Sequence, residues 1–553
     1  MTSPPLALSV TSDDSPPMHR LFTIPELVTA IIRELAWMQP LVHGPLTVCK
    51  LWADIVMDLI WQDINDLRTI FRLLAPVEEQ ASEDEDVVHD LYCSFKTLPT
   101  PSGWARFDLY RRRIRALDNN HDEVLYMSFR PVINDIAVLR PDSMALFPNL
   151  TELFWSYAHG DLWRESVFFM HKGIKKFSLM LWLGESGGQE TILRYFEHIA
   201  MRMPHLQSFN LNLCPYDATA ESQAHIGPAL SWLLPKLRFL TALTLPPMVD
   251  AYSIISSTAS LPNLETINAN IDVTIDRSLF SVSAPSPPTS NVTLSCSLQS
   301  LSLGISYSEA TTHLLYTEFP VLIKLSLWSH KPESQISTRT LTRAIALHCR
   351  SLREISLVAD ALDAPADGLD FLTDGRITLA DIQPLFGCRS VVRFSITHVL
   401  PLHLTNNDIR SLLTNWVTVV DLSLNHSPSR VLPPDAPEPY SDWETLVVVT
   451  EHGGHLEHLG LHLNGFAKFP PCVGMTSLPK LKQLSVGTSK IPSKMKDVLG
   501  PARFLSQFLT LQCRLQCSYK CLDRTGWDIL SELLESFIRV RMEEQEFARV
   551  RVR

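Results

Sequence analysis

One spacing of hydrophobic and polar positions recurs along most of the chain: an apolar residue, two variable residues, a second apolar residue, one variable residue and a third apolar residue. Clear copies begin at Leu150, Leu206, Leu264, Leu298, Leu322, Leu352, Leu456 and Leu481, and weaker copies begin at Ile174, Leu240, Val391 and Val419. Side chains alternate across a strand, so the last two apolar residues of a copy lie on one face of the strand and the residue between them lies on the opposite face. Each copy therefore predicts a turn followed by a short strand.

The stretches between copies have a helical pattern, as in the apolar segment 338–349. Successive copies start between 24 residues (Leu150 to Ile174) and 39 residues (Leu352 to Val391) apart. A single strand-and-helix unit cannot bury its apolar face alone, and it does so by stacking on its neighbours. The pattern resembles leucine-rich repeats, whose period is about 20 to 29 residues, in an irregular and longer form. It predicts an α/β repeat fold, a solenoid over residues 104–512 with parallel strands on its concave face.

Charge and composition argue against several classes of function. The formal net charge is −11 and the sequence indicates no basic face, so we expect no nucleic-acid partner. No apolar window reaches the roughly 20 residues of a membrane helix, and the N-terminus lacks the pattern of a signal peptide, so we expect no membrane association. The ten cysteines are scattered without a paired framework, which is typical of a reducing compartment. These features predict an intracellular protein, either cytoplasmic or nuclear.

The segment 177–196 contains G-x-S-x-G around Ser186, between a predicted strand and a predicted helix. In a hydrolase of this type an oxyanion-hole segment precedes the serine, and an acidic residue and a histidine follow it. An HGG sequence does occur, but at His452, far downstream of the serine. The repeat explains the same stretch as a strand, a loop and the helix of one unit. We therefore interpret Ser186 as a loop residue, and a serine hydrolase that uses Ser186 remains a distant alternative.

The remaining segments are predicted to flank or interrupt the repeats. Residues 1–19 are rich in Pro and Ser and predict a disordered tail, whereas the acidic stretch within 77–103 predicts a flexible loop. Residues 513–553 predict a segment that caps the array with an amphipathic helix. Cys513, Cys517 and Cys521 recur every four residues, so one helical face could gather them, but zinc sites favour closely spaced pairs with distant partners. We interpret that face as a packing face and expect no metal and no cofactor.

Residues 20–76 begin with a short helical block. Pro25 predicts a helix start, and Leu27, Ile31 and Leu35 follow at intervals of four as one apolar stripe. A break at 39–40 ends this helix, and a second apolar helical face follows over 46–56. So small and apolar a block is expected to bury its surface against something else. An alternative is a cap over the open end of the solenoid, and the two roles are compatible.

The same residues resemble an F-box, whose pattern is roughly L-P-x-E-[LI]-x-x-x-I-[LF]-x-x-L followed by V-C-[KR]-x-W. The chain has IPELVTAIIREL at 24–35 and VCKLW at 48–52. It departs from the pattern at Ile24, where leucine is usual, and at Pro45 in the middle region. The segment 103–117 looks like those that follow the F-box in the expanded F-box families of fungi. The resemblance implies an F-box and a linker helix over 20–76, ahead of the repeats.

F-box proteins of this arrangement are typically substrate-recognition subunits of Skp–cullin–F-box ubiquitin ligases. The resemblance therefore implies a Skp-type adaptor and a cullin as partners, an unknown protein target on the repeats, and no catalytic residue in this chain. The residues expected to contact the adaptor are Pro25, Leu27, Ile31, Leu35, Val48, Cys49 and Trp52. Those expected to contact the target are the solvent-side strand residues Asn210, Asn212, Ser326, Trp328, His458 and His462. The alternative is a non-catalytic repeat scaffold for protein–protein interaction without ubiquitination.

Overall fold

A computed structural model describes most of the chain, in two compact units. The described residues are 24–36, 43–81, 90–119, 126–140, 145–158, 163–181, 189–213, 220–246, 251–269, 292–293, 297–329, 331–359, 376–430, 441–470, 476–518, 521 and 524–552. Unit 1 comprises residues 1–156 and 165–174, and unit 2 comprises residues 157–164 and 175–553. None of the helices in the described part of the chain has both the length and the hydropathy needed to cross a bilayer.

Unit 1 begins with a helical block made of α1 (Pro25–Ala36), α2 (His43–Leu46) and α3 (Lys50–Gln62). Pro25 is the first residue of α1, where its missing N–H costs nothing and its fixed φ suits a helix. Buried side chains of α1 and α3 form a small core of Val28, Ile32, Ile55 and Val56. Leu46, Leu51, Trp52 and Leu59 are partly buried against it. The block therefore has a hydrophobic core of its own.

The rest of unit 1 contains two sheets. Its elements are β1 (Asp63–Ile64), α4 (Leu67–Phe71), β2 (Val77–Ala81), β3 (Asp90–Phe95), α5 (Pro101–Tyr110), β4 (Ala116–Asn119), β5 (Tyr126–Ser128), α6 (Arg130–Leu139) and most of β6 (Glu152–Ala158) and α7 (Trp163–Phe169). Strands β1, β4 and β6 are parallel neighbours. In the second sheet β2 pairs with β3 in antiparallel fashion, and β3 pairs with β5 in parallel.

The prediction of a flexible acidic loop over 77–103 is wrong for the residues described there. Most of them form β2, β3 and the start of α5, and residues 82–89 lie outside the described part. The backbone of Val77 is paired with that of Phe95, and Ala81 with Leu91. Glu78 and Glu79 point to opposite faces of this strand, and each has a partner there. Glu79 is exposed and pairs with the Arg68 guanidinium at 3.0 Å, and half-buried Glu78 accepts a hydrogen bond from the side chain of Gln80 at 2.9 Å. The acidic composition correctly indicated that this segment is exposed to water, but it did not indicate that β2 and β3 pair.

Helix α3 is tied directly to the first strands of unit 1. It runs without a linker into β1, and the N–H of Arg115 donates to the carbonyl of Gln62 at 2.8 Å. The Arg113 guanidinium donates to the carbonyl of Asp54 at 3.1 Å and forms an ion pair with the Asp58 carboxylate. The Trp61 and Tyr110 rings lie 4.6 Å apart. Four separate contacts thus hold the helical block to the adjacent sheet.

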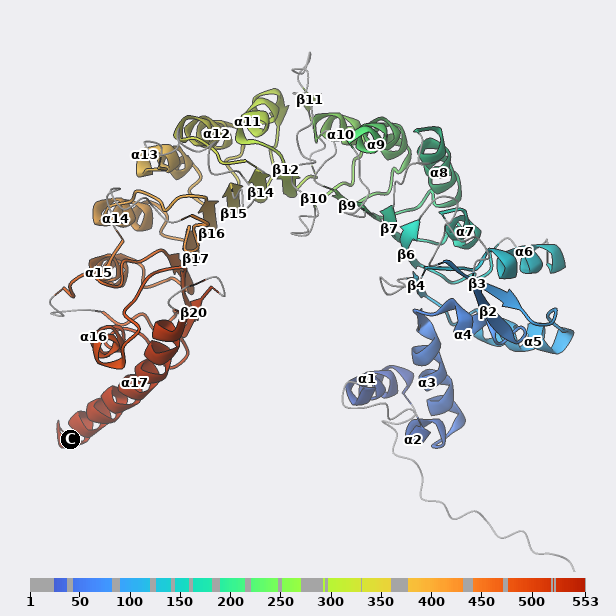
Figure 1. Cartoon of the computed structure of the whole chain (residues 1–553), viewed down its shortest axis with the longest axis horizontal. Coiled ribbons are helices and arrows are strands. Elements are labelled where there is room, and N and C mark those ends of the chain that lie inside the picture. Colours follow the sequence, from blue (N-terminus) through green and yellow to red (C-terminus); the bar gives the residue numbers. More distant parts are fainter. Residues whose placement is uncertain are drawn as a thin grey trace, which may run out of the picture. The chain divides into compact units, whose positions relative to one another are not determined.

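Unit 2 is a single stack of parallel strands (Figure 1). Its strands are β7 (Lys176–Leu181), β8 (Ser208–Leu213), β9 (Ala242–Leu245), β10 (Thr266–Ala269), β12 (Ser300–Gly304), β14 (Lys324–Ser329), β15 (Glu354–Ala359), β16 (Arg393–His398), β17 (Asp421–Leu424), β18 (His458–Leu461), β19 (Gln483–Gly487) and β20 (Arg514–Cys517), hydrogen-bonded in this order. A separate short parallel pair joins β11 (Val292–Thr293) to β13 (Thr317–Glu318).

All but the last of the described α-helices of unit 2 lie along one side of this stack, on the outside of the curve that its strands follow in Figure 1. They are α8 (Gln189–Arg202), α9 (Ala220–Leu233), α10 (Ala251–Thr258), α11 (Tyr307–Tyr316), α12 (Gln335–His348), α13 (Leu379–Ile382), α14 (Asn406–Asn415), α15 (Trp443–His452) and α16 (Met495–Leu505). The last helix, α17 (Arg524–Val552), lies at the end of the stack. The chain alternates strand and helix through most of unit 2, so its fold is an α/β solenoid of the leucine-rich-repeat type.

The predicted apolar positions form the core of these repeats. The first residues of the clear and weak copies are all at most 4% exposed. Neighbouring copies are in register, so that Phe177 lies beside Phe209 with stacked rings 6.0 Å apart, and Leu325 lies beside Ile355. Among the predicted strand positions Ala269 is only half-buried, at the end of β10. The repeat prediction is therefore confirmed at nearly every apolar position.

The C-terminal segment differs in part from its prediction. Residues 514–517 form β20, which extends the sheet, and the cap is α17, in which Trp527, Leu530 and Leu534 are buried. Cys513 immediately precedes this strand and Cys517 ends it, so the predicted helical face of cysteines is wrong. Cys513 and Cys517 are free thiols, and the described part of the chain contains no group of residues arranged to hold a metal.

Candidate protein-interaction surfaces

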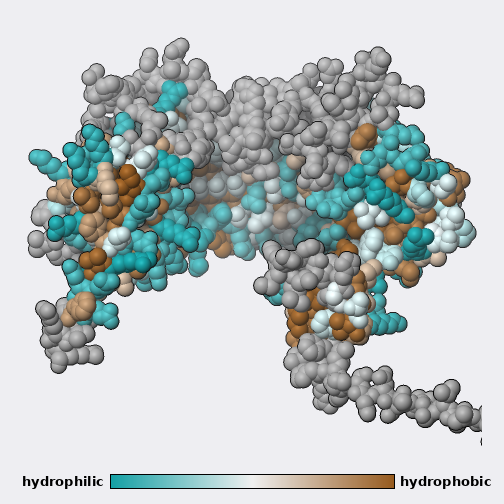
Figure 2. All heavy atoms as spheres, turned by 60° about the horizontal axis from the view of Figure 1, so that its bottom comes forward, coloured by the Kyte–Doolittle hydropathy of each residue, from teal (hydrophilic) through white to brown (hydrophobic). Residues whose placement is uncertain are grey.

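An apolar surface lies on the helical block, formed by α1, α3 and the turn before α3. Ile24 is 42% exposed, Leu27 39%, Val48 50% and Ile60 40%. Figure 2 shows hydrophobic side chains, coloured brown, on the surface of this block. We call these four residues the apolar surface of the block. Several large apolar residues left exposed on one small helical unit are typical of protein-interaction sites.

The predicted adaptor residues divide between this surface and the core beneath it. Pro25, Leu27 and Val48 are exposed, and Ile31 and Cys49 are half-buried. Trp52 packs against the small core, so its main contact is internal. The side chain of Leu35 lies outside the described part. The predicted set therefore includes both exposed and partly buried residues, while the residues that bury α1 are Val28 and Ile32; the contact of the set with an adaptor stays a prediction.

Sequence reasoning omitted Ile24 and Ile60 from the adaptor set, although the structure places both on the apolar surface. Ile24 precedes α1, and the N–H of Val28 donates to its carbonyl at 3.1 Å. Its position in the F-box-like pattern was a usable signal. Ile60 is one of several apolar residues of α3, and its exposure depends on how α3 packs, so no local signal indicated it.

The predicted target residues lie on strands of unit 2, on the side away from the helices. Asn210, Asn212, Ser326 and His458 are half-buried there. Ser326 is aligned with Ser302 on β12 and Ser356 on β15. His458 begins β18, and its Nδ1 atom lies 3.7 Å from the Asp421 carboxylate. The structure thus spreads these residues over several strands and does not bring them together in one pocket.

Trp328 was expected either to be a solvent-facing anchor or to pack on a neighbouring repeat. Only 7% of it is exposed, which favours packing and corrects its place among the target-contact residues. It lies on β14 between Gly304 and Val358 of the neighbouring strands. Because the neighbouring strand has a glycine at this position, the indole ring has room to pack against the sheet and become buried. Trp328 therefore acts in packing and is not available to a partner in this conformation.

His462 is also more enclosed than predicted. Burial is the main cause that lowers its pKa from 6.5 to about 4; a hydrogen bond with the His426 backbone opposes this shift, and the nearby Lys490 charge adds to it. His426 folds back over the sheet beside it, where a Cβ on Gly460 would lie 3.1 Å from the His426 Nδ1 atom. The absence of a side chain at Gly460 thus makes room for the imidazole. His426 therefore covers part of the strand side at this point, and His462, which is half-buried, is less open to target contact than predicted.

The depressed pKa of His462 predicts a pH-dependent stability. Above its unfolded value of 6.5 the residue contributes no pH dependence, because it is neutral in both states. Between pH 6.5 and about 4 the unfolded chain binds a proton that the folded one excludes. We therefore expect the free energy of unfolding to fall by about 1 kcal/mol for each unit by which the pH is lowered within that range. Urea denaturation at pH 7.5 and pH 5 should show a smaller loss for His462→Gln than for the natural chain; equal losses would contradict the prediction.

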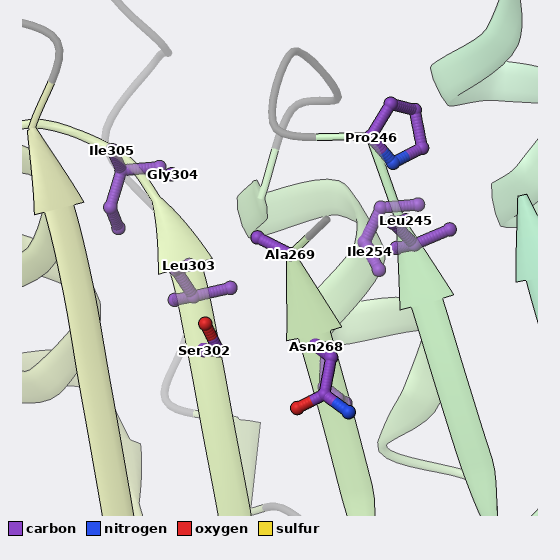
Figure 3. Close-up of a pocket in the computed structure, with 10 residues that line it drawn as sticks. Leu245, Pro246, Ile254, Asn268, Ala269, Ser302, Leu303, Gly304 and Ile305 are labelled. Carbon is purple, nitrogen blue, oxygen red and sulfur yellow. The ribbon is translucent and has the colours of Figure 1, made fainter. Parts of the chain in front are cut away.

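A small apolar cavity lies at the carboxyl ends of β9, β10 and β12 (Figure 3). Its lining includes Leu245, Pro246, Ala269 and Leu303, and its volume is about 20 Å³. Strands β10 and β12 pair only at their first two residues, so the sheet opens beyond Ile267. The space suffices for about one water-sized molecule, whereas ligand pockets measure about 300 Å³ or more. We interpret this cavity as a packing defect where the sheet opens.

Ser186 lies in 182–188, outside the described residues. The strand before it and the helix after it are present as predicted, in β7 and α8. Both belong to the repeat, as Phe177 and Leu179 are buried beneath the sheet. The flanking elements therefore agree with the interpretation of this stretch as one unit of the array.

No known protein family and no curated protein matches the sequence. Similar solved structures include Rad7 from the yeast Rad7–Elc1 complex, which is 13% identical with a TM-score of 0.34, over 71% of this chain and 85% of that one. TLR13 bound to ssRNA13 is 16% identical with a TM-score of 0.29, over 76% of this chain and 61% of that one. The leucine-rich-repeat ectodomain of GASSHO1/SCHENGEN3 from Arabidopsis thaliana is 13% identical with a TM-score of 0.24, over 74% and 47%.

Proposed function

We propose that this protein is a substrate-recognition subunit of a Skp–cullin–F-box ubiquitin ligase. The helical block binds a Skp-type adaptor, and the repeats bind a protein target. The protein has no catalytic step of its own in this proposal. It raises the effective concentration of a target lysine near the charged conjugating enzyme, which converts a rare encounter into an effectively intramolecular one.

The observation that carries the proposal is the apolar surface of the block. Leu27 and Val48 match the F-box-like pattern, and they are exposed while Val28 and Ile32 fill the core. A helix whose pattern residues were needed only for its own folding would bury them. Their exposure supports a partner that covers them, and burying apolar side chains stabilises a complex by about 25 cal/mol per Å² before association costs.

The contacts between α3 and the adjacent sheet support the same role. Arg113 contacts the carboxylates of Asp54 and Asp58 and the carbonyl of Asp54 on α3. The block is therefore fixed to the rest of unit 1 by direct contacts. An adaptor bound to α1 and α3 would then be held in a defined orientation to the neighbouring strands of unit 1. We expect Arg113→Ala to keep adaptor binding while it speeds amide exchange in α3, by a factor of about 5 for a lost contribution near 1 kcal/mol.

The test is co-expression of the full chain with a Skp-type adaptor, followed by addition of a cullin. We expect the chain to co-purify with the adaptor in a stoichiometric complex, and the complex to retain the cullin. Absence of adaptor binding by a chain with the far-ultraviolet circular dichroism of a folded α/β protein would overturn the proposal. Residues 24–62 would then be only an end cap of the array.

A second candidate function is a repeat scaffold that binds proteins without ubiquitination. The extended strand side of unit 2 favours it, since that surface needs no ligase to bind a partner. The two functions differ in one measurement. A scaffold can bind the adaptor and still fail to retain the cullin, whereas a ligase receptor retains it.

A further inference from the structure

Two rows of side chains cross the middle of unit 2 on the side away from the helices. The first row consists of the initial residues of four neighbouring strands, and it alternates in charge: Lys324, Glu354, Arg393 and Asp421. The second row lies two residues further along each strand and is made of serine alone: Ser302, Ser326, Ser356, Ser395 and Ser423. We call them the ionic row and the serine row.

The ionic row is accessible, and its internal pairs are weak. Lys324 is 53% exposed and Arg393 61%, and both pair with Glu354, at 3.5 and 2.9 Å. Ion pairs this exposed contribute little to stability, so a partner can exchange them for its own. Because like charges placed opposite each other across an interface are costly, an alternating row discriminates strongly among partners.

The serine row offers a shallow floor with free hydroxyl groups. Ser302, Ser326, Ser356 and Ser395 are half-buried, and their hydroxyls have no hydrogen-bond partner among the described residues. Ser423 is the exception, since its Oγ lies 3.1 Å from the His426 Nδ1 atom. Small side chains let a partner's backbone approach closely, and each hydroxyl can both donate and accept.

The two rows are bounded on three sides. Beyond β17, His426 covers the sheet at Gly460. Before β12, the pairing with β10 ends after two residues. Further along the strands Trp328 is buried. The open band therefore spans β12 to β17, a width of about 19 Å at the usual strand spacing of about 4.8 Å.

We propose that this band binds one α-helix of the protein target, laid across the strands with small residues on the serine row and alternating acidic and basic residues on the ionic row. The inference rests on the proposed function, of which it specifies the target. The spacing selects a helix: one turn rises about 5.4 Å, close to the strand spacing of about 4.8 Å, so four turns laid along the ionic row differ from its four strands by only about 2 Å in total. In an extended segment, residues on the same side are about 6.8 Å apart, which does not match the strand spacing of about 4.8 Å.

The probe is a synthetic alanine-based helix of about four turns with Glu, Lys, Glu and Lys on one face, one per turn. Its control has the same composition in the order Glu, Glu, Lys, Lys, which fits the ionic row in neither direction. Fluorescence anisotropy with the full chain should show at least about tenfold tighter binding of the alternating peptide, weakened by salt. Equal affinities, or no saturable binding, would refute the proposal.

Variants locate the site. Ser356→Trp fills the middle of the floor and should weaken the alternating peptide at least about tenfold. Thr340→Trp, on the exposed side of α12 in the adjoining repeat, should leave it unchanged. If Ser356→Trp binds as the natural chain does, the band is not the site. The exchange Lys324→Glu with Glu354→Lys reorders the row and should shift preference to a Lys, Glu, Glu, Lys peptide; an unshifted preference contradicts the charge argument.

These results separate the inference from the proposed function. Adaptor binding depends on the helical block, and peptide binding depends on β12 to β17. A chain that binds the adaptor but discriminates neither peptide refutes only the helix inference. A chain that discriminates the peptides but binds no adaptor refutes the ligase receptor and leaves the helix-binding scaffold.

Discussion

We expect Leu27→Asp combined with Val48→Asp to prevent most of the proposed adaptor binding while leaving the fold intact. The two side chains are 39% and 50% exposed and lie outside the small core, so their replacement costs folding little. In the complex each aspartate would bring a charge into an apolar contact. Truncation of an interface anchor alone costs about 2 kcal/mol or more, so we expect affinity to fall at least about 100-fold. Titration calorimetry with the purified adaptor measures the change.

Two controls make this result specific. Leu109→Asp places the same charge on α5, at an apolar residue that is 68% exposed and outside the apolar surface, and it should bind the adaptor normally. Val28→Ala removes a fully buried side chain beneath the surface and should lower stability instead. Trp52 is a poor probe because it packs against this core. Normal binding by the double aspartate variant would mean that the adaptor, if bound, uses another surface.

Trp416→Ala will cost unit 2 about 3–5 kcal/mol, the usual penalty for emptying a fully buried tryptophan site. Trp416 follows α14 and is 0% exposed. Its ring lies 4.9 Å from that of Phe394 on β16 and 5.4 Å from that of Phe386 in the preceding repeat. It therefore joins two repeats, and in a solenoid the loss of a nearest-neighbour contact is felt most by the units it connects.

The neighbouring residue supplies the control. Val417 is 67% exposed, and Val417→Ala should change stability by less than about 0.5 kcal/mol. Urea denaturation followed by circular dichroism compares the two variants, and amide exchange should accelerate most in β16 and β17. Similar losses from both substitutions would show that Trp416 does not join the repeats. Because Arg393 and Ser395 lie on β16, we also expect the tryptophan variant to bind the helical probe more weakly.

The repeat core was predictable because its signal is local and repeated. Each copy pairs an apolar alternation with a helical stretch, and Leu206, Phe209 and Leu211 are fully buried as expected. The start of α1 at Pro25 was predictable for the same reason. The pairing of β2 with β3 was not predictable from local signals. The two strands are separated by an acidic segment, and they pair only because the chain after that segment comes back alongside β2.

Which apolar residues stay exposed could not be read from composition. Leu27 and Val28 are adjacent and both apolar, yet one is 39% exposed and the other 0%. The difference arises because α3 packs on one side of α1 and not on the other. Trp328 shows the converse, since an expected surface anchor is buried where the neighbouring strand has Gly304.

By itself the sequence determined the α/β repeat, the apolar positions of nearly every strand and the existence of a helical block before them, because alternation and helical periodicity act within a few residues. Only the tertiary structure decided the exposure of Leu27 and Val48, the enclosure of Trp328 and His462, and the alignment of serines from successive repeats into one row. These depend on which segments, tens of residues apart, come to lie side by side. Burial and register are properties of that contact and not of any single stretch of chain.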